Sequence, residues 1–305
     1  MAISSVKVTI NGTTTTLTDN GNGTYSATLA APNKTSYNIN SGHYYPVTVT
    51  ATNMAGTATT INDSDSTLGS KLRLFVKEIT APTITISQPT SNQYLATSTP
   101  TIKFNLVDES NGSGIAISTL SFKVDNTTYT NTSNGVTVSA ITNGYQVTFV
   151  PTTALSDGSH TVTVNVKDND GNSATSASVS FTTDTVAPTL SITNPPTSGS
   201  YTSTSALNVT GTVNDSTSGS PTVKITLNGS DVGAVTVSNG AFSKGVTLAN
   251  GTNTIVVTAT DLAGKVTTIT RTIILDTSAP VIASVEITPN PVNVGASYTV
   301  TIKVN

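Results

Sequence analysis

The sequence predicts an all-β chain built from tandem β-sandwich domains, and three observations lead to this prediction. Apolar residues alternate with polar ones along most of the chain, as in strands that bury one face. A sustained apolar period of about 3.6 residues is absent, and no apolar run approaches the ~18 residues of a membrane-spanning helix. One sequence unit also recurs roughly 100 residues apart, which indicates an array of similar domains.

The recurring unit occupies residues 160–192 and 253–285, with a looser copy beginning at 46–61. Each copy alternates, turns at Asn/Asp-x-x-Gly, alternates again and leads to an Ala-Pro pair. Two alternating runs around a glycine turn predict a hairpin, and the following proline cannot lie inside a sheet. We interpret the unit as the last hairpin of one domain plus a semi-rigid joint to the next, which favours an elongated array. The predicted domains are 1–80, 81–184, 185–277 and 278–305.

Within the first domain, alternation predicts strands at 6–10 and 24–30. Residues 62–70 read as a loop, and 72–78 as a closing strand. A further strand is expected to turn one face inward through Val47, Val49 and Ala51.

The second and third domains show clearer columns of inward residues. In the second domain these are Ile102, Phe104, Leu106, Leu120, Phe122, Val124, Val147, Phe149, Val162, Val164 and Val166. In the third they are Leu207, Val209, Val223, Ile225, Leu227, Ile255, Val257 and Ala259. About seven short strands separated by turns predict an immunoglobulin-like sandwich. Residues 278–305 hold two strands of a fourth unit, which cannot bury a core alone; we favour truncation of a longer chain over completion by a partner.

Composition excludes several classes of partner and chemistry. The net charge is −3 and only 10% of residues are charged, so neither nucleic acid nor an anionic membrane is expected as a partner. Cysteine is absent, which excludes disulfides and thiolate chemistry. The N-terminus begins as a strand, without the basic and apolar regions of a signal peptide.

A search for catalytic groups predicts a non-enzymatic chain. The histidines are His43 and His160, and aligning the repeats places Tyr45, His160 and Asn253 in one slot. Three different side chains in one slot indicate packing or hydrogen bonding rather than a catalytic base. The sequence reveals no Ser/His/carboxylate arrangement and no carboxylate pair across a cleft.

Two other surface chemistries are disfavoured by the sequence. An internal Lys–Asn isopeptide bond needs a buried lysine, but Lys103, Lys123 and Lys224 fall between inward residues and should face outward. A carbohydrate platform needs exposed aromatic rings, and the best group is Tyr37, Tyr44 and Tyr45. Tyr45 shares the inward parity of Val47, so a solvent-facing Tyr44 without a ligand is the favoured interpretation.

Acidic residues gather in the turns that should lie at the N-terminal end of each sandwich. For the second domain they are Asp108, Glu109, Asp168 and Asp170, joined by Glu78 from the incoming linker. For the third they are Asp215 and Asp261, joined by incoming Asp184. Clustered carboxylate oxygens are typical ligands of Ca²⁺, the one cofactor weighed here. Because Asp also caps turns through its own backbone, turn capping is the favoured interpretation.

Longer motifs resemble known domains. The second domain, with VDESNGSGI, LSFKVDNTTY and HTVTVNVKDNDGN, resembles bacterial Ig-like (Big-type) repeats of surface and phage proteins. The third, with VTGTVND and VVTATDLAGK, is similar to an Ig-like module found beside glycoside hydrolase domains. The first, with VKVTING, TVTATNMAG and TLGSKLRLFVKE, resembles Ig-like segments in tail proteins of phages that infect Gram-positive bacteria.

These resemblances imply a structural or adhesive protein. The first hypothesis is a virion component of a tailed phage or phage-tail-like particle, present in several copies on a symmetric particle. Its expected partners are other virion and tail proteins, together with host cell-wall glycans. The alternatives are a stalk fragment of an adhesin on the bacterial cell surface and the accessory region of a secreted glycosidase.

Overall fold

The computed structural model describes residues 2–305, and these form tandem β-sandwiches with 3-10 turns at Gly69–Lys71 and Ile117–Thr119. The chain divides into two compact units, one ending at Asp184 and the other spanning Thr185–Asn305. The all-β, tandem Ig-like prediction is confirmed. Over the described residues, no helix is long and apolar enough to cross a membrane. We keep the predicted domain boundaries as names for the parts.

The first domain is built on one sheet with the order β2-β1-β5-β6. These strands are β1 (Ile3–Ile10), β2 (Thr13–Thr16), β5 (Tyr45–Asn53) and β6 (Ala58–Ile61), and β7 (Arg73–Leu74) pairs with the start of β5. Asn11 and Gly12 both have positive φ, 48° and 76°, as a two-residue hairpin turn between β1 and β2 requires. Val6, Val8 and Tyr45 are its buried apolar side chains.

Two strand predictions in the first domain are wrong in extent. The expected strand at 24–30 contains only β4 (Tyr25–Ser26), which pairs with β3 (Thr18–Asp19). The expected closing strand at 72–78 contains only β7. The second strand ends early because the backbone of Val76 pairs with Ser36 and not with a neighbouring strand. The amide of Ser36 donates to the carbonyl of Val76 at 2.8 Å, and the amide of Val76 donates to Ser36 Oγ at 3.0 Å.

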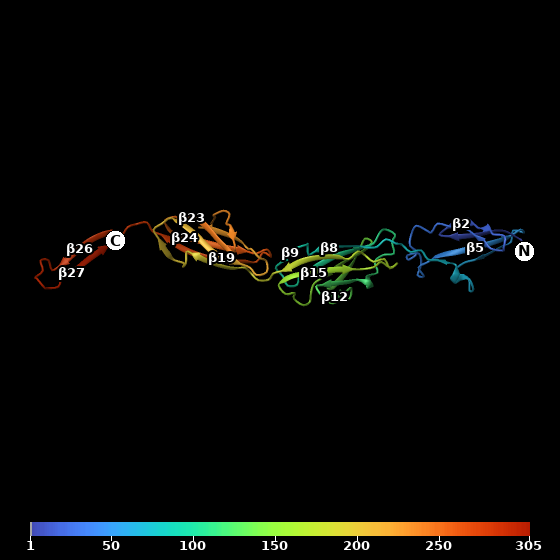
Figure 1. Ribbon diagram of the computed structural model, residues 1–305, viewed down its shortest axis with the longest axis horizontal. Coiled ribbons are helices and arrows are strands. Elements are labelled where there is room, and N and C mark those ends of the chain that lie inside the picture. Colours follow the sequence, from blue (N-terminus) through green and yellow to red (C-terminus); the bar gives the residue numbers. More distant parts are fainter. Residues whose placement is uncertain (1) are drawn as a thin grey trace. The chain divides into compact units, whose positions relative to one another are not determined.

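The second domain is a closed sandwich of two sheets (Figure 1). One sheet has the order β13-β14-β10-β8 and the other β12-β11-β15-β16-β9. The strands are β8 (Thr83–Gln88), β9 (Gln93–Leu95), β10 (Ile102–Val107), β11 (Ser121–Val124), β12 (Thr127–Thr130), β13 (Val136–Ile141), β14 (Gly144–Phe149), β15 (Gly158–Asn165) and β16 (Ala177–Thr183). Every inward residue predicted for this domain is buried, and Phe181 and Ile115 join the same core.

The third domain repeats this arrangement within its own unit. Its sheets have the orders β17-β19-β23-β22 and β18-β25-β24-β20-β21. The strands are β17 (Thr189–Asn194), β18 (Ser200–Thr202), β19 (Ala206–Asn214), β20 (Thr222–Leu227), β21 (Ser230–Asp231), β22 (Val237–Ser238), β23 (Ala241–Thr247), β24 (Gly251–Thr260) and β25 (Val266–Leu275). The predicted inward residues lie in its core, with Leu207 and Leu227 partly buried against it.

The last residues form one antiparallel hairpin, β26 (Ile282–Thr288) with β27 (Thr299–Val304). Val285 pairs with Ile302, and Ile287 pairs with Val300. All four of these apolar side chains are exposed.

Candidate functional site

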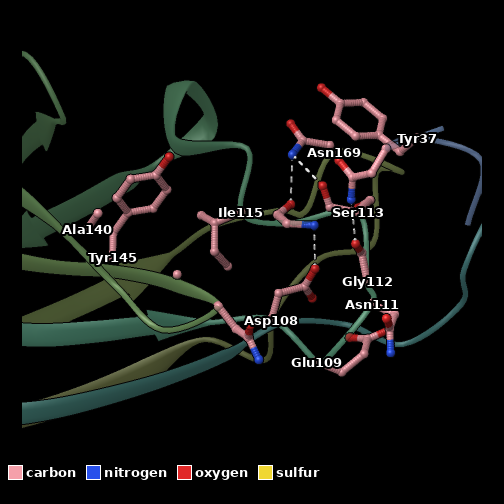
Figure 2. Close-up of a pocket in the computed structure, with 14 residues that line it drawn as sticks. Tyr37, Asp108, Glu109, Asn111, Gly112, Ser113, Ile115, Ala140, Tyr145 and Asn169 are labelled. Carbon is pink, nitrogen blue, oxygen red and sulfur yellow. Dashed lines mark hydrogen bonds between the residues drawn. The ribbon is translucent and has the colours of Figure 1, made fainter. Parts of the chain in front are cut away.

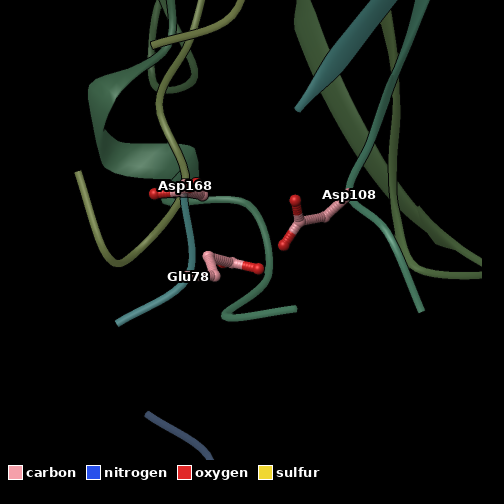
Figure 3. A group of neighbouring side chains, drawn as sticks. All are labelled: Glu78, Asp108 and Asp168. Atoms are coloured by element: carbon pink, nitrogen blue, oxygen red, sulfur yellow. The ribbon is translucent and has the colours of Figure 1, made fainter. Parts of the chain in front are cut away.

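Three of the predicted acids meet at one end of the second sandwich (Figure 3). Asp108 follows β10 directly, Asp168 lies in the turn after β15, and Glu78 belongs to the segment that enters the domain before β8. One carboxylate oxygen from each of the three lies within 4.8 Å of the others. The site therefore joins segments that are 30 and 60 residues apart in sequence, by subtraction of their residue numbers.

Each acid uses at least one carboxylate oxygen to fix a loop. Asp108 Oδ2 accepts from the amide of Gly114 at 2.6 Å (Figure 2). Glu78 Oε1 accepts from the amide of Ser113 at 2.6 Å. Asp168 Oδ1 accepts from the amides of Gly171 at 2.6 Å and Asn172 at 2.8 Å. Asp168 therefore caps its own turn, as predicted, whereas Asp108 and Glu78 bind the loop at Ser113 and Gly114. These bonds also fix the direction in which the remaining oxygens point.

Asp168 Oδ2 also accepts a hydrogen bond, from Asn172 Nδ2 at 2.7 Å, so both of its oxygens are paired. Three other oxygens of this group are not. Asp108 Oδ1, Glu78 Oε2 and Glu109 Oε2 are buried and lack a hydrogen-bond partner among the described residues. Asp108 and Asp168 are 3% and 2% exposed, respectively. A cleft of about 460 Å³, lined by Asp108, Glu109 and Asn169 among others, opens beside them.

The crowding of carboxyls perturbs their ionisation. A hydrogen bond shared with Glu78, and then burial, raises the pKa of Glu109 to about 7. Burial, and to a lesser degree the charge of Glu78, raises the pKa of Asp108. The hydrogen bond from the amide of Gly114 acts in the opposite direction but does not cancel this rise. Burial also acts to raise the pKa of Glu78, but hydrogen bonds from Glu109 and Ser113 together bring it below its ordinary value. Two carboxylates can share a hydrogen bond only while one holds a proton, so fully ionised oxygens here face each other unpaired.

Asp170 lies next to this group and holds the linker. Its Oδ2 accepts from Thr35 Oγ1 at 2.5 Å and from the amide of Glu78 at 3.1 Å. Asn172 Nδ2 donates to the carbonyl of Glu78 at 3.2 Å, and Asn38 Nδ2 donates to the carbonyl of Gly112 at 2.9 Å. Hydrogen bonds thus connect the first domain, the linker and the loops of the second domain.

The third domain carries a related pair. Asp215 follows β19, and its Oδ1 accepts from the amides of Thr217 and Ser218 at 2.8 and 2.7 Å. Asp261 follows β24; its Oδ1 accepts from the amide of Lys265 at 2.8 Å, and its Oδ2 has no hydrogen-bond partner within residues 2–305. Carboxylate oxygens of the two acids lie within 4.8 Å of each other. Asp184 is the buried last residue of the first unit, and its role as a third ligand stays a prediction.

The shared slot of His160 and Asn253 has a structural role. His160 is buried, with Nδ1 2.8 Å from Asp125 Oδ2 and Nε2 2.8 Å from the carbonyl of Ser156. Asn253 is buried as well, and donates to the carbonyls of Ala249 and Gly251 at 2.7 and 3.0 Å. In both domains the residue in this slot connects a strand to a neighbouring turn. This agrees with the prediction that the slot is a packing or hydrogen-bonding position.

The aromatic residues gather differently from the prediction. Tyr45 is buried, as expected. Tyr44 Oη donates to Asp63 Oδ2 at 2.9 Å, and its ring lies 5.9 Å from that of Phe75 and 4.7 Å from the guanidinium of Arg73. Phe75 is 61% exposed. We call Tyr44, Asp63, Arg73 and Phe75 the aromatic surface. The sequence carries no signal for Arg73 and Phe75, because a long-range pairing of β7 with β5 brings this segment to Tyr44.

The other residues singled out lie as follows. Tyr37 stacks on His43 with 4.1 Å between ring centroids. Lys123 and Lys224 are exposed and Lys103 is half-buried, so the predicted outward direction holds for the first two and in part for the third.

Family comparisons agree with these sandwiches. Residues 89–185 match the family described as bacterial Ig-like domain, and residues 188–277 match glucodextranase domain B. The comparison with curated proteins found no match.

The chain is also similar to several solved structures at low sequence identity. Fibronectin(III)-like modules of Clostridium thermocellum CbhA are 17% identical, over 63% of this chain and 94% of theirs, with a TM-score of 0.39. A 1.5-MDa bacterial ice-binding adhesin is 23% identical, over 90% of this chain and 88% of its own, with a TM-score of 0.32. Titin domains Z1Z2 are 18% identical, over 65% of this chain and 98% of theirs, with a TM-score of 0.25. The two family matches support a bacterial Ig-like repeat protein.

Proposed function

We propose that the chain is a non-enzymatic spacer and adhesive appendage of a tailed phage or phage-tail-like particle. The observation that carries the spacer function is the hydrogen-bonded joint between the first and second domains. Asp170 holds both Thr35 and Glu78, and Asn38 reaches Gly112. Each such bond contributes about 0.5–1.5 kcal/mol, so the group together opposes free swivelling of the linker.

The spacer also carries a surface suited to host contact. On the aromatic surface, the exposed ring of Phe75 can stack against the apolar C–H face of a sugar. Arg73 and Asp63 lie at its rim and offer a donor and an acceptor for hydroxyl groups. Tyr44 is held by contacts on several sides, so little ordering entropy is lost on binding. Cell-wall glycans are therefore the proposed ligand class.

A single surface of this size binds weakly, and copies on one particle multiply the binding by effective concentration. To test the contact, Phe75→Ala and the control Leu262→Ala are displayed as tetramers and bound to isolated host cell walls. Both residues are exposed. We expect Phe75→Ala to lower retention severalfold and Leu262→Ala to leave it unchanged. Equal retention of the two variants would remove the aromatic surface from the proposal.

The virion location is supported by the resemblance of the first domain to Ig-like segments of phage tail proteins. Particles made with and without the gene are compared by electron microscopy, and their adsorption to host cells is measured. We expect particles lacking the gene to lose density at the tail and to adsorb more slowly. Intact density and unaltered adsorption would favour the bacterial surface adhesin. A catalytic domain encoded in the same gene would favour the glycosidase alternative.

A further inference from the structure

We propose that Glu78, Asp108 and Asp168 bind a Ca²⁺ ion at the joint of the first and second domains, with Glu109 as a fourth carboxylate. The inference deepens the proposed spacer function, because an ion there would fasten the incoming linker to two loops of the next sandwich. Three features support this site: the spacing of the oxygens, the lack of a hydrogen-bond partner among the described residues for Asp108 Oδ1, Glu78 Oε2 and Glu109 Oε2, and the types of atom present.

The spacing of the oxygens fits the ion. Oxygen ligands lie 2.3–2.6 Å from Ca²⁺, so two ligands on opposite sides of the ion are about 4.6–5.2 Å apart. One oxygen from each of Glu78, Asp108 and Asp168 lies within 4.8 Å of the others (Figure 3). An ion centred among them would therefore lie close to coordination distance from all three carboxylates.

The unpaired oxygens indicate that a positive charge belongs there. Asp108 is 97% buried, as its 3% exposure implies, yet its Oδ1 has no hydrogen-bond partner in residues 2–305. Glu78 Oε2 and Glu109 Oε2 are also buried without a hydrogen-bond partner among the described residues. An ionised carboxylate that loses water without gaining a partner is strongly disfavoured. A bound cation supplies the missing partner for all three.

No protein cation fills this role in the described part of the chain. The ion pairs found there join His160 to Asp125 and Lys224 to Asp231, away from the site. Lys77 lies nearby, but its Nζ donates to the carbonyl oxygen of Asp170 at 3.2 Å and not to a carboxylate. The excess negative charge is thus left for an ion from solution.

The donor atoms select the ion. Glu78, Asp108, Glu109 and Asp168 offer oxygen alone, whereas Zn²⁺ sites draw on His nitrogen and Cys sulfur. Mg²⁺ requires a near-octahedral arrangement and retains several waters, but Ca²⁺ accepts irregular sets of six to eight oxygens. The amides that bind the first oxygens of Asp108 and Asp168 hold these carboxylates in place, as outer partners do in metal sites.

The test measures Ca²⁺ binding to the full chain by titration calorimetry, and thermal unfolding in millimolar Ca²⁺ or chelator. The variants are Asp108→Asn and the control Glu286→Gln, an exposed acid on β26. We expect wild type and control to bind Ca²⁺ and to unfold at higher temperature with it. Asp108→Asn should bind one ion fewer, or bind it at least tenfold more weakly. In chelator it should be as stable as wild type or more so, because a buried unpaired charge is gone.

Several outcomes overturn the proposal. The first is that wild type does not bind Ca²⁺ at millimolar concentration. The second is that Asp108→Asn binds Ca²⁺ as tightly as wild type, and the third is that Mg²⁺ stabilises wild type as much as Ca²⁺ does. If Asp108→Asn does not fold, Glu78→Gln in the half-buried linker replaces it under the same criteria. The particle experiment does not depend on Ca²⁺, so a negative result here removes the metal site and leaves the spacer function standing.

Discussion

The first and second domains use the same alternating strands but are stabilised in different ways. In the second, the rings of Phe104, Phe122 and Phe149 are fully buried and meet at centroid distances of 5.3–5.4 Å between two facing sheets. In the first, a single main sheet is covered by irregular chain, and the buried residues include Thr35 and Ser36. Alternation thus specifies a strand with one inward face, but a continuous apolar core also needs a second sheet opposite.

A charge placed in the apolar core of the second domain should have the largest effect on stability. Val164 on β15 is completely buried, so Val164→Asp places an unpaired charge in the core and should unfold the second domain. The neighbouring Asn165 is exposed, and Asn165→Asp should leave the domain folded. Calorimetry should show one cooperative transition lost in the first variant and retained in the second. A wild-type trace for Val164→Asp would contradict the assigned core.

Truncating one buried side chain in each domain should have a smaller effect on stability and compares the two cores directly. Phe122→Ala leaves a cavity among three aromatic neighbours and should lower the free energy of unfolding by about 3–5 kcal/mol. Val8→Ala in the first domain removes two methyl groups at a residue that is 9% exposed, and should lower it by about 1–1.5 kcal/mol. Denaturant unfolding measures both values. Equal losses would mean that the first domain depends on apolar packing as much as the second.

The hydrogen bonds that hold the irregular chain of the first domain can be tested at Ser36. Ser36 Oγ donates to the carbonyl of His43 at 2.7 Å and accepts from the amide of Val76 at 3.0 Å, inside the first domain. Ser36→Ala leaves a buried amide unpaired and should lower the free energy of unfolding by about 1–3 kcal/mol. The control is Ser178→Ala on an exposed position of β16, for which we expect less than about 0.5 kcal/mol. Denaturant unfolding that shows no loss for Ser36→Ala would refute a loop held by hydrogen bonds.

Much of the fold follows from local rules. The inward columns of the second and third domains follow from side-chain alternation, and the structure buries them as predicted. Asp125 and Asn228 carry positive φ of 53° and 50° at matching turns, and the amides of both donate to a neighbouring strand at 2.8 Å. Turn residues of these types tolerate that backbone conformation, so such turns are visible in the sequence.

The closing segment of the first domain could not be predicted in this way. Residues 72–78 alternate like a strand, yet the backbone of Val76 bonds to Ser36, which lies 40 residues earlier. The same fold-back sets Phe75 beside Tyr44 and creates the aromatic surface. A long-range partner decides both outcomes, and periodicity carries no information about it.

Local sequence patterns are enough to predict an all-β chain, repeating domains, and acids that follow the strands at one end of the second and third sandwiches. These features depend on the period of a strand and on the preferences of turn residues, which act over a few neighbours. The convergence of Glu78, Asp108 and Asp168 within 4.8 Å, with the buried Oε2 of Glu78 and Oδ1 of Asp108 unpaired among the described residues, depends on the folded chain. Convergence requires three segments distant in sequence to be fixed together, because distances between side chains are set by packing and not by spacing along the chain.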